Sequence, residues 1–206
     1  MPTQEETLSH LISQGYLHSP KIIEAMEKIR REDFLPPEMR RFAWDDHPLP
    51  IGFGQTISAP HMYAFMLEAA NVKPGDNVLE IGTGSGYGAA LLSFLCGKKG
   101  KVTSIERISG LVEFAEKNLE KCELRADVLQ GDGSKGYDKN APYDKIIVTA
   151  ACDSIPPALV EQLKTGGKLL IPVGIYFQDL ILVEKSGSGI KETALMPVIF
   201  VPLVKD

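Results

Sequence analysis

A run of glycines behind an acidic residue is the part of the sequence best suited to chemistry. The apolar stretch 77–81 contains Glu80, and the residues that follow it are Gly82, Thr83, Gly84, Ser85, Gly86, Tyr87 and Gly88. Glycine adopts backbone angles that other residues avoid and leaves no side chain in the way, so its backbone can approach a ligand closely. The run therefore predicts a loop that binds a nucleotide-like cofactor.

Two cofactor classes fit this motif, and so does a purely structural glycine turn. The spacing Glu-x-Gly-x-Gly-x-Gly resembles the first motif of class I S-adenosylmethionine-dependent methyltransferases. Gly84, Gly86 and Ala89 also satisfy the dinucleotide fingerprint, with Glu106 about 20 residues farther on. Glu80 favours the methyltransferase, because a carboxylate at the strand end would support the ammonium end of a cationic cofactor. A pyrophosphate has no use for that carboxylate.

Two more acidic residues follow predicted strands. Glu106 ends the apolar stretch 101–106, where a carboxylate can accept hydrogen bonds from two ribose hydroxyls; alternatively it is a solvated residue at a strand end. Asp132 lies between Gly131 and Gly133, where an adenine amino group would arrive, although Gly-Asp-Gly is also an ordinary turn. Ligands of doubly wound sheets bind at the carboxyl ends of the strands. We therefore expect Glu80, Glu106, Asp132 and Gly133 at one cofactor site.

The composition excludes several classes of protein. The chain has 206 residues, with 22 Lys and Arg against 27 Asp and Glu, which gives no positive footprint for nucleic acid. Cys96, Cys122 and Cys152 match neither a disulfide framework nor a zinc site, and the four histidines lie singly, so we expect no metal. No apolar run is long enough to span a membrane, and the first residues do not resemble a signal peptide. These observations predict a cytoplasmic protein.

The elements that position these residues follow from the periodicity. Residues 3–47 are predicted to be helical, with Ser19 as a cap, Pro20 in a first turn, and an apolar stripe of Ile22, Ile23, Met26 and Ile29. From residue 77 strands and helices alternate. The strands are predicted at 77–81, 101–106, 126–130, 144–149 and 168–173, and the helices at 85–95, 109–121 and after Pro156. Short connections between such elements require parallel pairing.

The alternation ends near Asp179. Apolar stretches at 180–184 and 198–204 are separated by the turn 186–189, which predicts an antiparallel pair at the sheet edge. Gly166 and Gly167 are predicted to form the turn before the strand 168–173. The expected fold is α/β, a doubly wound, mostly parallel seven-stranded Rossmann-like sheet in one domain, 1–206. Residues 1–47 would form an N-terminal helical extension, and 48–206 the substrate loop and cofactor-binding sheet.

Further segments resemble one family, the protein-L-isoaspartate (D-aspartate) O-methyltransferases. The resemblance covers the chain from about residue 30 onward, and Gly-Gln-Thr-Ile-Ser-x-Pro at 54–60 is specific to that family, whereas the glycine motif belongs to the whole superfamily. The matching segments, in family order, are 48–62, 78–87, 104–107, 131–133, 141–151, 172–174 and 200–204.

The resemblance implies transfer of a methyl group from S-adenosylmethionine to the free α-carboxylate of L-isoaspartyl residues, leaving S-adenosylhomocysteine. The ester closes to a succinimide, which can reopen to aspartate. It implies a substrate-orienting catalytic residue, Ser58, with Thr56 and Val204 also at the substrate. The cofactor residues that it implies are Pro60, His61, Met62, Glu80, Gly82, Thr83, Gly84, Ser85, Gly86, Glu106, Asp132 and Gly133. The expected partners are isoaspartyl-containing proteins and peptides, and the chain is expected to be a monomer.

Alternatives remain at the level of single residues and of function. Ser58 precedes Pro60 and a helix-like run, so it could be an ordinary helix cap, and His61 could be an ordinary, partly exposed histidine. A methyltransferase acting on another carboxyl group or on a small molecule is the closest rival. An oxidoreductase that binds a dinucleotide and a cofactor-binding protein without turnover are rivals from other classes.

Overall fold

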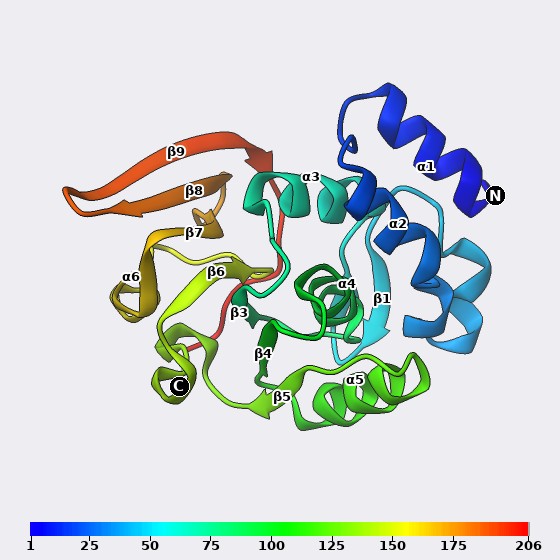
Figure 1. The fold of residues 1–206 in the computed structure, drawn as a ribbon. Coiled ribbons are helices and arrows are strands. Elements are labelled where there is room, and N and C mark those ends of the chain that lie inside the picture. Colours follow the sequence, from blue (N-terminus) through cyan, green and yellow to red (C-terminus); the bar gives the residue numbers. More distant parts are fainter. Residues whose placement is uncertain (206) are drawn as a thin grey trace.

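A seven-stranded sheet with helices on both faces forms the centre of the computed structural model, which describes residues 1–205 (Figure 1). The strand order is β5-β4-β3-β6-β7-β8-β9, and a separate hairpin is formed by β1 and β2. The strands are β1 (Leu49–Gly52), β2 (Gln55–Ile57), β3 (Asn77–Ile81), β4 (Lys101–Glu106), β5 (Asp127–Gln130), β6 (Tyr143–Val148), β7 (Leu163–Val173), β8 (Gln178–Ser186) and β9 (Gly189–Val198).

The pairing is parallel from β5 to β7 and antiparallel for β8 and β9, which confirms the predicted sheet and its antiparallel edge. The α-helices are α1 (Gln4–Ser13), α2 (Pro20–Lys28), α3 (Pro60–Ala70), α4 (Tyr87–Cys96), α5 (Ser109–Lys121) and α6 (Pro157–Gln162). Short 3-10 helices are η1 (Arg31–Phe34), η2 (Pro37–Phe42), η3 (Gly133–Lys135) and η4 (Asp138–Asn140).

Two apolar cores, one on each face of the sheet, pack it against these helices. One core contains side chains from α1 to α5 together with strand residues such as Val78, and the other contains Leu79, Ile81 and residues of α6 and β7. Alternate residues of β3 therefore reach opposite cores, as the two-residue period of a strand requires. No helix within residues 1–205 has the length and apolar character needed to cross a membrane.

The N-terminal extension packs behind the glycine loop. Arg31 of η1 is fully buried, its Nε donates to the carbonyl of Ala43 over 2.7 Å, and its guanidinium lies over the ring of Tyr87 at 5.5 Å. Phe34 meets the same ring edge-on, with centroids 5.4 Å apart. Because Tyr87 is the first residue of α4, the extension supports the helix that the glycine loop opens.

Ser19 is the N-cap residue of α2, as predicted, but its hydroxyl makes no capping bond and donates instead to Glu68 over 2.6 Å. Two other local predictions in this scaffold are wrong. Gly166 and Gly167 lie inside β7, where the register with β6 shifts, as glycines at bulges do.

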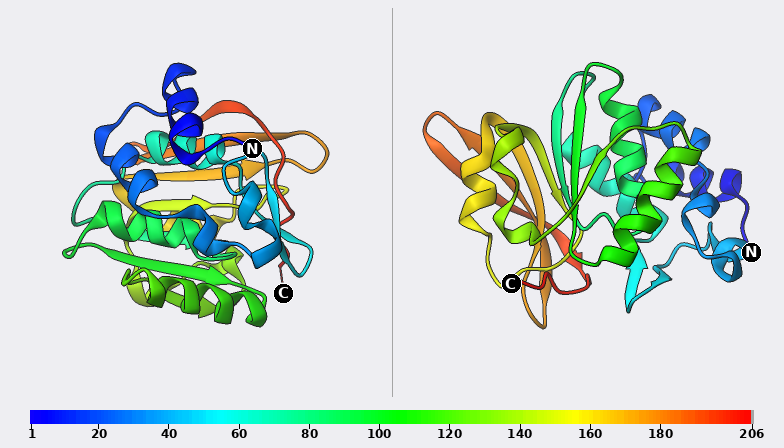
Figure 2. Two further views of the ribbon diagram at one scale, coloured as in Figure 1. Left: turned by 90° about the vertical axis from the view of Figure 1, so that its right-hand side faces the viewer. Right: turned by 90° about the horizontal axis from the view of Figure 1, so that it is seen from below.

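The strand predicted at 198–204 is the second error. β9 ends at Val198, and Pro202 makes only an isolated bridge with Ala151, since proline has no N–H to continue a ladder. The amide of Ala151 donates to the carbonyl of Val201 over 2.8 Å, and the amide of Leu203 donates to the carbonyl of Ala151 over 2.7 Å. Residues 199–205, the C-terminal segment, are thereby held across the end of the parallel sheet (Figure 2).

Candidate active site

A cleft lies at the carboxyl ends of the parallel strands, where the strand order reverses around β3. β3 pairs with β4 on one side and with β6 on the other, and ligands of doubly wound folds bind at this kind of switch point. The β1–β2 hairpin and the C-terminal segment complete the walls. The lining residues are Gln55, Thr56, Ile81, Gly82, Gly84, Ile105, Glu106, Arg107, Ile108, Gly131, Gly133, Thr149, Ala150, Val201, Pro202, Leu203 and Val204.

The glycine loop follows β3 in a conformation that only glycine adopts easily. Gly82 has a φ of +92°, and a Cβ there would collide with Oγ1 of Thr149. That oxygen instead donates to the carbonyl of Gly82 over 2.9 Å. Gly86 has a φ of +90° and lies against Ala115 of α5, 3.2 Å from where its Cβ would be. The loop is therefore clamped between β6 and α5.

Glu106 closes this loop from β4. Its Oε2 accepts the amide of Gly84 over 2.9 Å, and its Oε1 accepts the amide of Ile108 over 3.0 Å. An ionised carboxyl group has about four lone-pair sites in all, so each oxygen keeps capacity for one more donor. Glu106 is 8% exposed and lines the cleft, so two hydroxyl groups of a ligand can reach it.

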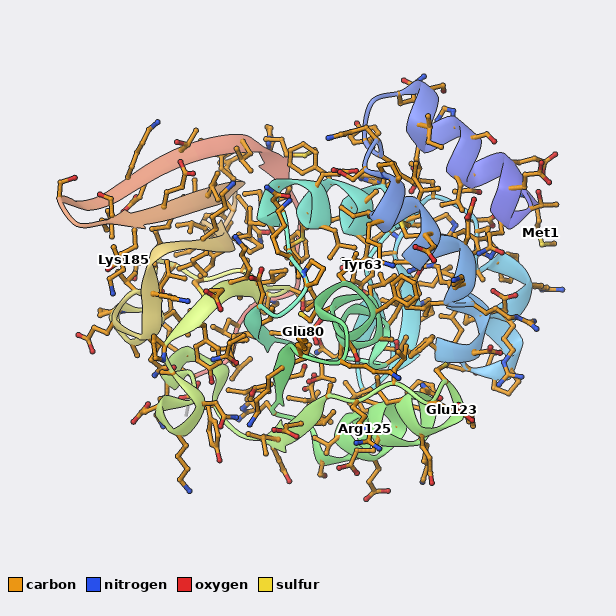
Figure 3. The ribbon with its side chains drawn as sticks, viewed as in Figure 1. Met1, Tyr63, Glu80, Glu123, Arg125 and Lys185 are labelled. Carbon is orange, nitrogen blue, oxygen red and sulfur yellow. The ribbon has the colours of Figure 1, made fainter. Side chains whose placement is uncertain are left out.

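Glu80 lies elsewhere than the sequence suggested. Its side chain is 1% exposed and is not part of the cleft lining; it lies in the interior between β3 and α4 (Figure 3). A Cβ at Gly88 would collide with Oε1 of Glu80, so the first turn of α4 rests directly on the carboxyl group. The strand turns the Glu80 side chain beneath the helix, away from the residues that line the cleft.

Glu80 instead anchors a chain of buried hydrogen bonds. Ser104 Oγ donates to Glu80 Oε2 over 2.5 Å, and the hydroxyls of Ser104 and Thr83 are 2.6 Å apart. All three residues are buried, so the hydrogen-bond chain joins β3, β4 and the glycine loop in a region closed to bulk solvent. Burial, and to a smaller degree the charge of Glu106, raise the pKa of Glu80 to about 8, although the Ser104 hydrogen bond lowers it.

Asp132 lies outside the cleft lining, although the glycines on either side of it belong to that lining. Gly131 and Gly133 line the cleft, whereas Asp132 is not among the lining residues. Its Oδ1 accepts the amide and the hydroxyl of Ser134 over 2.9 and 2.7 Å, and its Oδ2 lies 3.2 Å from Nζ of Lys135. The carboxylate therefore caps η3 and fixes the two glycines between which it lies.

An apolar groove meets the cleft. Thr56, Thr149 and Val201 line both cavities, and the groove runs between the start of α3 and the end of β9. Its remaining lining residues are Pro48, Ser58, Ala59, His61, Met62, Met196, Pro197, Val198, Ile199 and Phe200. His61 and Met62, expected at the cofactor, thus line the groove, and Pro60 lines neither cavity. Among the expected substrate residues, Ser58 lies in the groove, Val204 in the cleft and Thr56 in both.

The hydroxyl of Ser58 is free of internal bonds. The N-cap residue of α3 is Ala59, without a side-chain cap, and within residues 1–205 the Ser58 side chain has no hydrogen-bond partner. The alternative that Ser58 caps this helix is therefore wrong. His61 in contrast is engaged, since its Nδ1 and its amide both contact Oδ1 of Asp46 over 2.9 Å.

Other predicted loop residues are buried around the cleft. Thr83 and Ser85 are 2% exposed, and the carbonyl of Ser85 accepts the side-chain amide of Asn118 over 3.0 Å. Within residues 1–205 no group of three or more His, Cys, Asp and Glu side chains is placed to hold a metal ion.

Thr149 is the main site residue that the sequence analysis missed. It follows β6, the fourth parallel strand, and joins the cleft, the groove and the glycine loop. The rule that placed Glu80, Glu106 and Asp132 at three strand ends applies to this strand end as well, so Thr149 could have been predicted from the sequence. Arg107 and Ile108 were missed as well, because their approach to the cleft depends on the tertiary fold.

The buried carboxyl group gives a pH test of stability. A carboxyl whose pKa rises on folding, from 4.5 to about 8, keeps a proton that the unfolded chain releases. Its contribution is fully present below the unfolded value and is lost as the pH rises toward 8. We expect Glu80→Gln to remove this loss, so that urea unfolding between pH 5 and 8 shows the variant gaining more than about 1 kcal/mol relative to the parent chain.

Glu113, which is exposed on α5, provides the matched control. The Glu113→Gln variant should follow the pH profile of the parent chain. Parallel profiles for Glu80→Gln and the parent chain would show that Glu80 does not hold its proton in the native state.

Comparisons with known proteins agree with this geometry. Residues 2–206 match the family model described as Protein-L-isoaspartate(D-aspartate) O-methyltransferase (PCMT). The Protein-L-isoaspartate O-methyltransferase of Ignicoccus hospitalis is 50% identical over 206 residues, which cover 98% of each chain. That of Pyrococcus horikoshii is 51% identical over 206 residues, 98% of this chain and 93% of the relative.

A solved structure is similar over its full length. It is that of a Plasmodium falciparum protein assigned as a protein-L-isoaspartate O-methyltransferase, in complex with S-adenosyl-L-homocysteine. The two chains share 27% identity and a TM-score of 0.89, with 100% of each covered. Match of the family model to nearly every residue, together with relatives at about half identity, shows that this chain belongs to the protein-L-isoaspartate (D-aspartate) O-methyltransferase family.

Proposed function

We propose that the chain methylates the free α-carboxylate of L-isoaspartyl residues in damaged proteins and peptides, with S-adenosylmethionine as the methyl donor. The observation that carries the proposal is the junction of the cleft and the apolar groove at Thr56, Thr149 and Val201. A donor in the cleft and a carboxylate in the groove would meet at this junction. Membership of the family supports both the identity of the methyl donor and that of the isoaspartyl substrate.

The residues of the cleft fit an adenosine-bearing donor. Glu106 offers a free lone pair on each oxygen to two ribose hydroxyls, and Gly131 and Gly133 leave room for a flat base against the backbone. We propose that Gly82, Gly84 and Gly133 contact the donor directly. Other residues do not touch the donor but hold the loops that make these contacts; they are Glu80, Thr83, Ser85, Gly86 and Asp132.

The chemistry requires alignment rather than a proton acceptor. S-adenosylmethionine supplies a methyl group on a positively charged sulfur, which accepts the S–C electron pair when the carboxylate oxygen attacks from the opposite side. A carboxylic acid with a pKa of about 3.9 is already ionised at pH 7, so no general base is needed. The chain contributes orientation in line and a site from which water is largely excluded.

Ser58 and the groove supply these contributions. The unpaired hydroxyl of Ser58 can donate to the substrate carboxylate and fix its direction, and Thr56 lies where the groove joins the cleft. Met62, Met196 and Val198 make the groove apolar, which strengthens that hydrogen bond because few waters compete for it. The methyl ester loses methanol more readily than a carboxylate loses an oxide ion, so the following backbone nitrogen can attack the ester carbonyl, expel methanol and close a succinimide, which water can reopen to aspartate.

We further propose that the protein works in a reducing compartment, the cytoplasm. Its thiols are unpaired: Cys96 and Cys152 are buried and Cys122 is half-buried. Burial raises the pKa of Cys96 to about 12 and that of Cys152 to about 11, so both stay protonated and unreactive at neutral pH.

The role of Glu106 can be tested by calorimetry with S-adenosylhomocysteine. We expect Glu106→Ala to weaken binding by about 1.5–3 kcal/mol, the usual contribution of hydrogen bonds to a charged group. Glu113→Ala, on the exposed face of α5, should bind like the parent chain. Undiminished affinity in a Glu106→Ala variant that melts like the parent chain would contradict the ribose assignment.

The role of Ser58 can be separated from a structural one. Because its hydroxyl has no partner within residues 1–205, Ser58→Ala should leave the melting temperature and the affinity for S-adenosylhomocysteine unchanged. Its kcat/KM for an isoaspartyl peptide should fall about 10- to 100-fold, as expected for one hydrogen bond to a carboxylate. Ser188→Ala, in the exposed β8–β9 turn, is the control. Normal kcat/KM in Ser58→Ala would exclude the orienting role.

The function itself is tested with two peptides that differ only in carrying isoaspartate or aspartate. Isoaspartate leaves an α-carboxylate on a backbone lengthened by one methylene, so only this form should place its carboxylate in line with the methyl group. We expect methyl transfer to the isoaspartyl peptide and negligible transfer to the aspartyl one. Comparable kcat/KM for both peptides would instead favour a general carboxyl or small-molecule methyltransferase.

A further inference from the structure

The turn between β7 and β8 exposes three consecutive apolar side chains. Ile175, Tyr176 and Phe177 are 70, 92 and 94% exposed, and Ile199 on the C-terminal segment is 93% exposed. Single exposed apolar residues are common, but a run of this kind at a projecting tip is typical of an interaction site. The four residues are called the apolar tip below.

The apolar tip is held in place by the structure beneath it. The amide of Gly174 donates to the carbonyl of Cys152 over 2.8 Å, which ties the beginning of the turn to the chain after β6. The side chain of Gln178 accepts the amide of Phe200 over 2.6 Å and donates to its carbonyl over 3.1 Å. Ile199, the residue before Phe200, is thereby fixed beside the end of the turn.

The apolar tip is continuous with the substrate groove. A depression between the turn and the C-terminal segment shares Phe200 with the groove, and its full lining is Ala151, Asp153, Gly174, Ile175, Gln178, Phe200, Pro202, Leu203 and Lys205. Ile199 itself lines the groove. Seen from below, the β7–β8 turn and the β1–β2 hairpin project from the same edge of the molecule, on either side of the C-terminal segment (Figure 2).

This arrangement matches one feature of the substrate. A folded protein buries its apolar side chains, whereas an unfolded segment offers them together with its backbone. A chain that places its isoaspartyl residue in the groove would carry its neighbouring residues past Phe200 toward the apolar tip. The four side chains of the tip are uncharged, and the charged residues of the depression, Asp153 and Lys205, pair with each other over 2.7 Å, so the tip itself favours apolar over charged neighbours.

We propose that the apolar tip is a docking surface for apolar residues of an unfolded polypeptide that flank the isoaspartyl residue beyond the groove. The proposal rests on the proposed function, because it assigns the partner to the same substrate. It predicts that the enzyme distinguishes long, apolar, unfolded substrates from short ones through residues that do not touch the reacting groups.

The test uses the double variant Tyr176→Ser/Phe177→Ser and three isoaspartyl peptides. One is a hexapeptide, one is a long peptide with apolar flanks, and one is the same long peptide with serine in place of the apolar flanking residues. We expect kcat/KM of the double variant to fall about 5-fold or more for the long apolar peptide alone, an effect of the size that loss of interface aromatics produces. The control is Ile190→Ser, at a half-exposed position near the start of β9, and its kcat/KM for all three peptides should equal that of the parent chain.

Three results would overturn the docking surface. Unchanged kcat/KM on all peptides would show that the tip makes no contact, and an equal loss on all of them would show that the turn acts only by shaping the active site. Self-association of the parent chain in sedimentation, abolished in the double variant, would assign the tip to a second copy of the chain. Absence of methyl transfer to the hexapeptide by the parent chain would refute the proposed function instead.

Discussion

The buried hydrogen-bond chain from Glu80 through Ser104 to Thr83 is the interaction on which the site depends. It joins two neighbouring strands to the glycine loop over distances of 2.5 and 2.6 Å. Because it lies beneath α4 without access to water, breaking it would leave polar groups buried and unpaired, which costs about 1–3 kcal/mol per group. The loop is therefore held in one conformation before any ligand arrives.

Two acidic residues at the ends of adjacent strands thereby acquire different tasks. Glu80 is enclosed, and burial raises its pKa to about 8, so it serves the interior as a hydrogen-bonding group. Glu106 faces the cleft and organises the loop through two backbone amides while keeping lone pairs for a ligand. The N-terminal extension adds a third support, since Arg31 and Phe34 hold Tyr87 at the start of α4.

Much of this architecture could be predicted from the sequence. The apolar periods placed β3, β4 and α5 with their observed bounds, because these elements are regular and buried. Because these strands could be placed, the rule that ligands bind at the carboxyl ends of parallel strands then pointed to Glu106 and the glycine loop. The orientation of Glu80 could not be predicted, since adjacent strand residues reach opposite faces and the glycine spacing does not show which face receives α4. The segment after Val198 escaped prediction because its apolar residues resemble a strand, whereas its path depends on contacts with Ala151.

The central claim is that a preformed cleft holds the methyl donor by its ribose while Glu80 stays inside. A crystal structure of the complex with S-adenosylhomocysteine tests it most directly. The account predicts both ribose hydroxyls within about 2.5–3.0 Å of the Glu106 oxygens, an unchanged glycine loop, and Glu80 still bonded to Ser104. A ribose bound away from Glu106, or a Glu80 side chain turned outward to the amino acid end of the ligand, would contradict it.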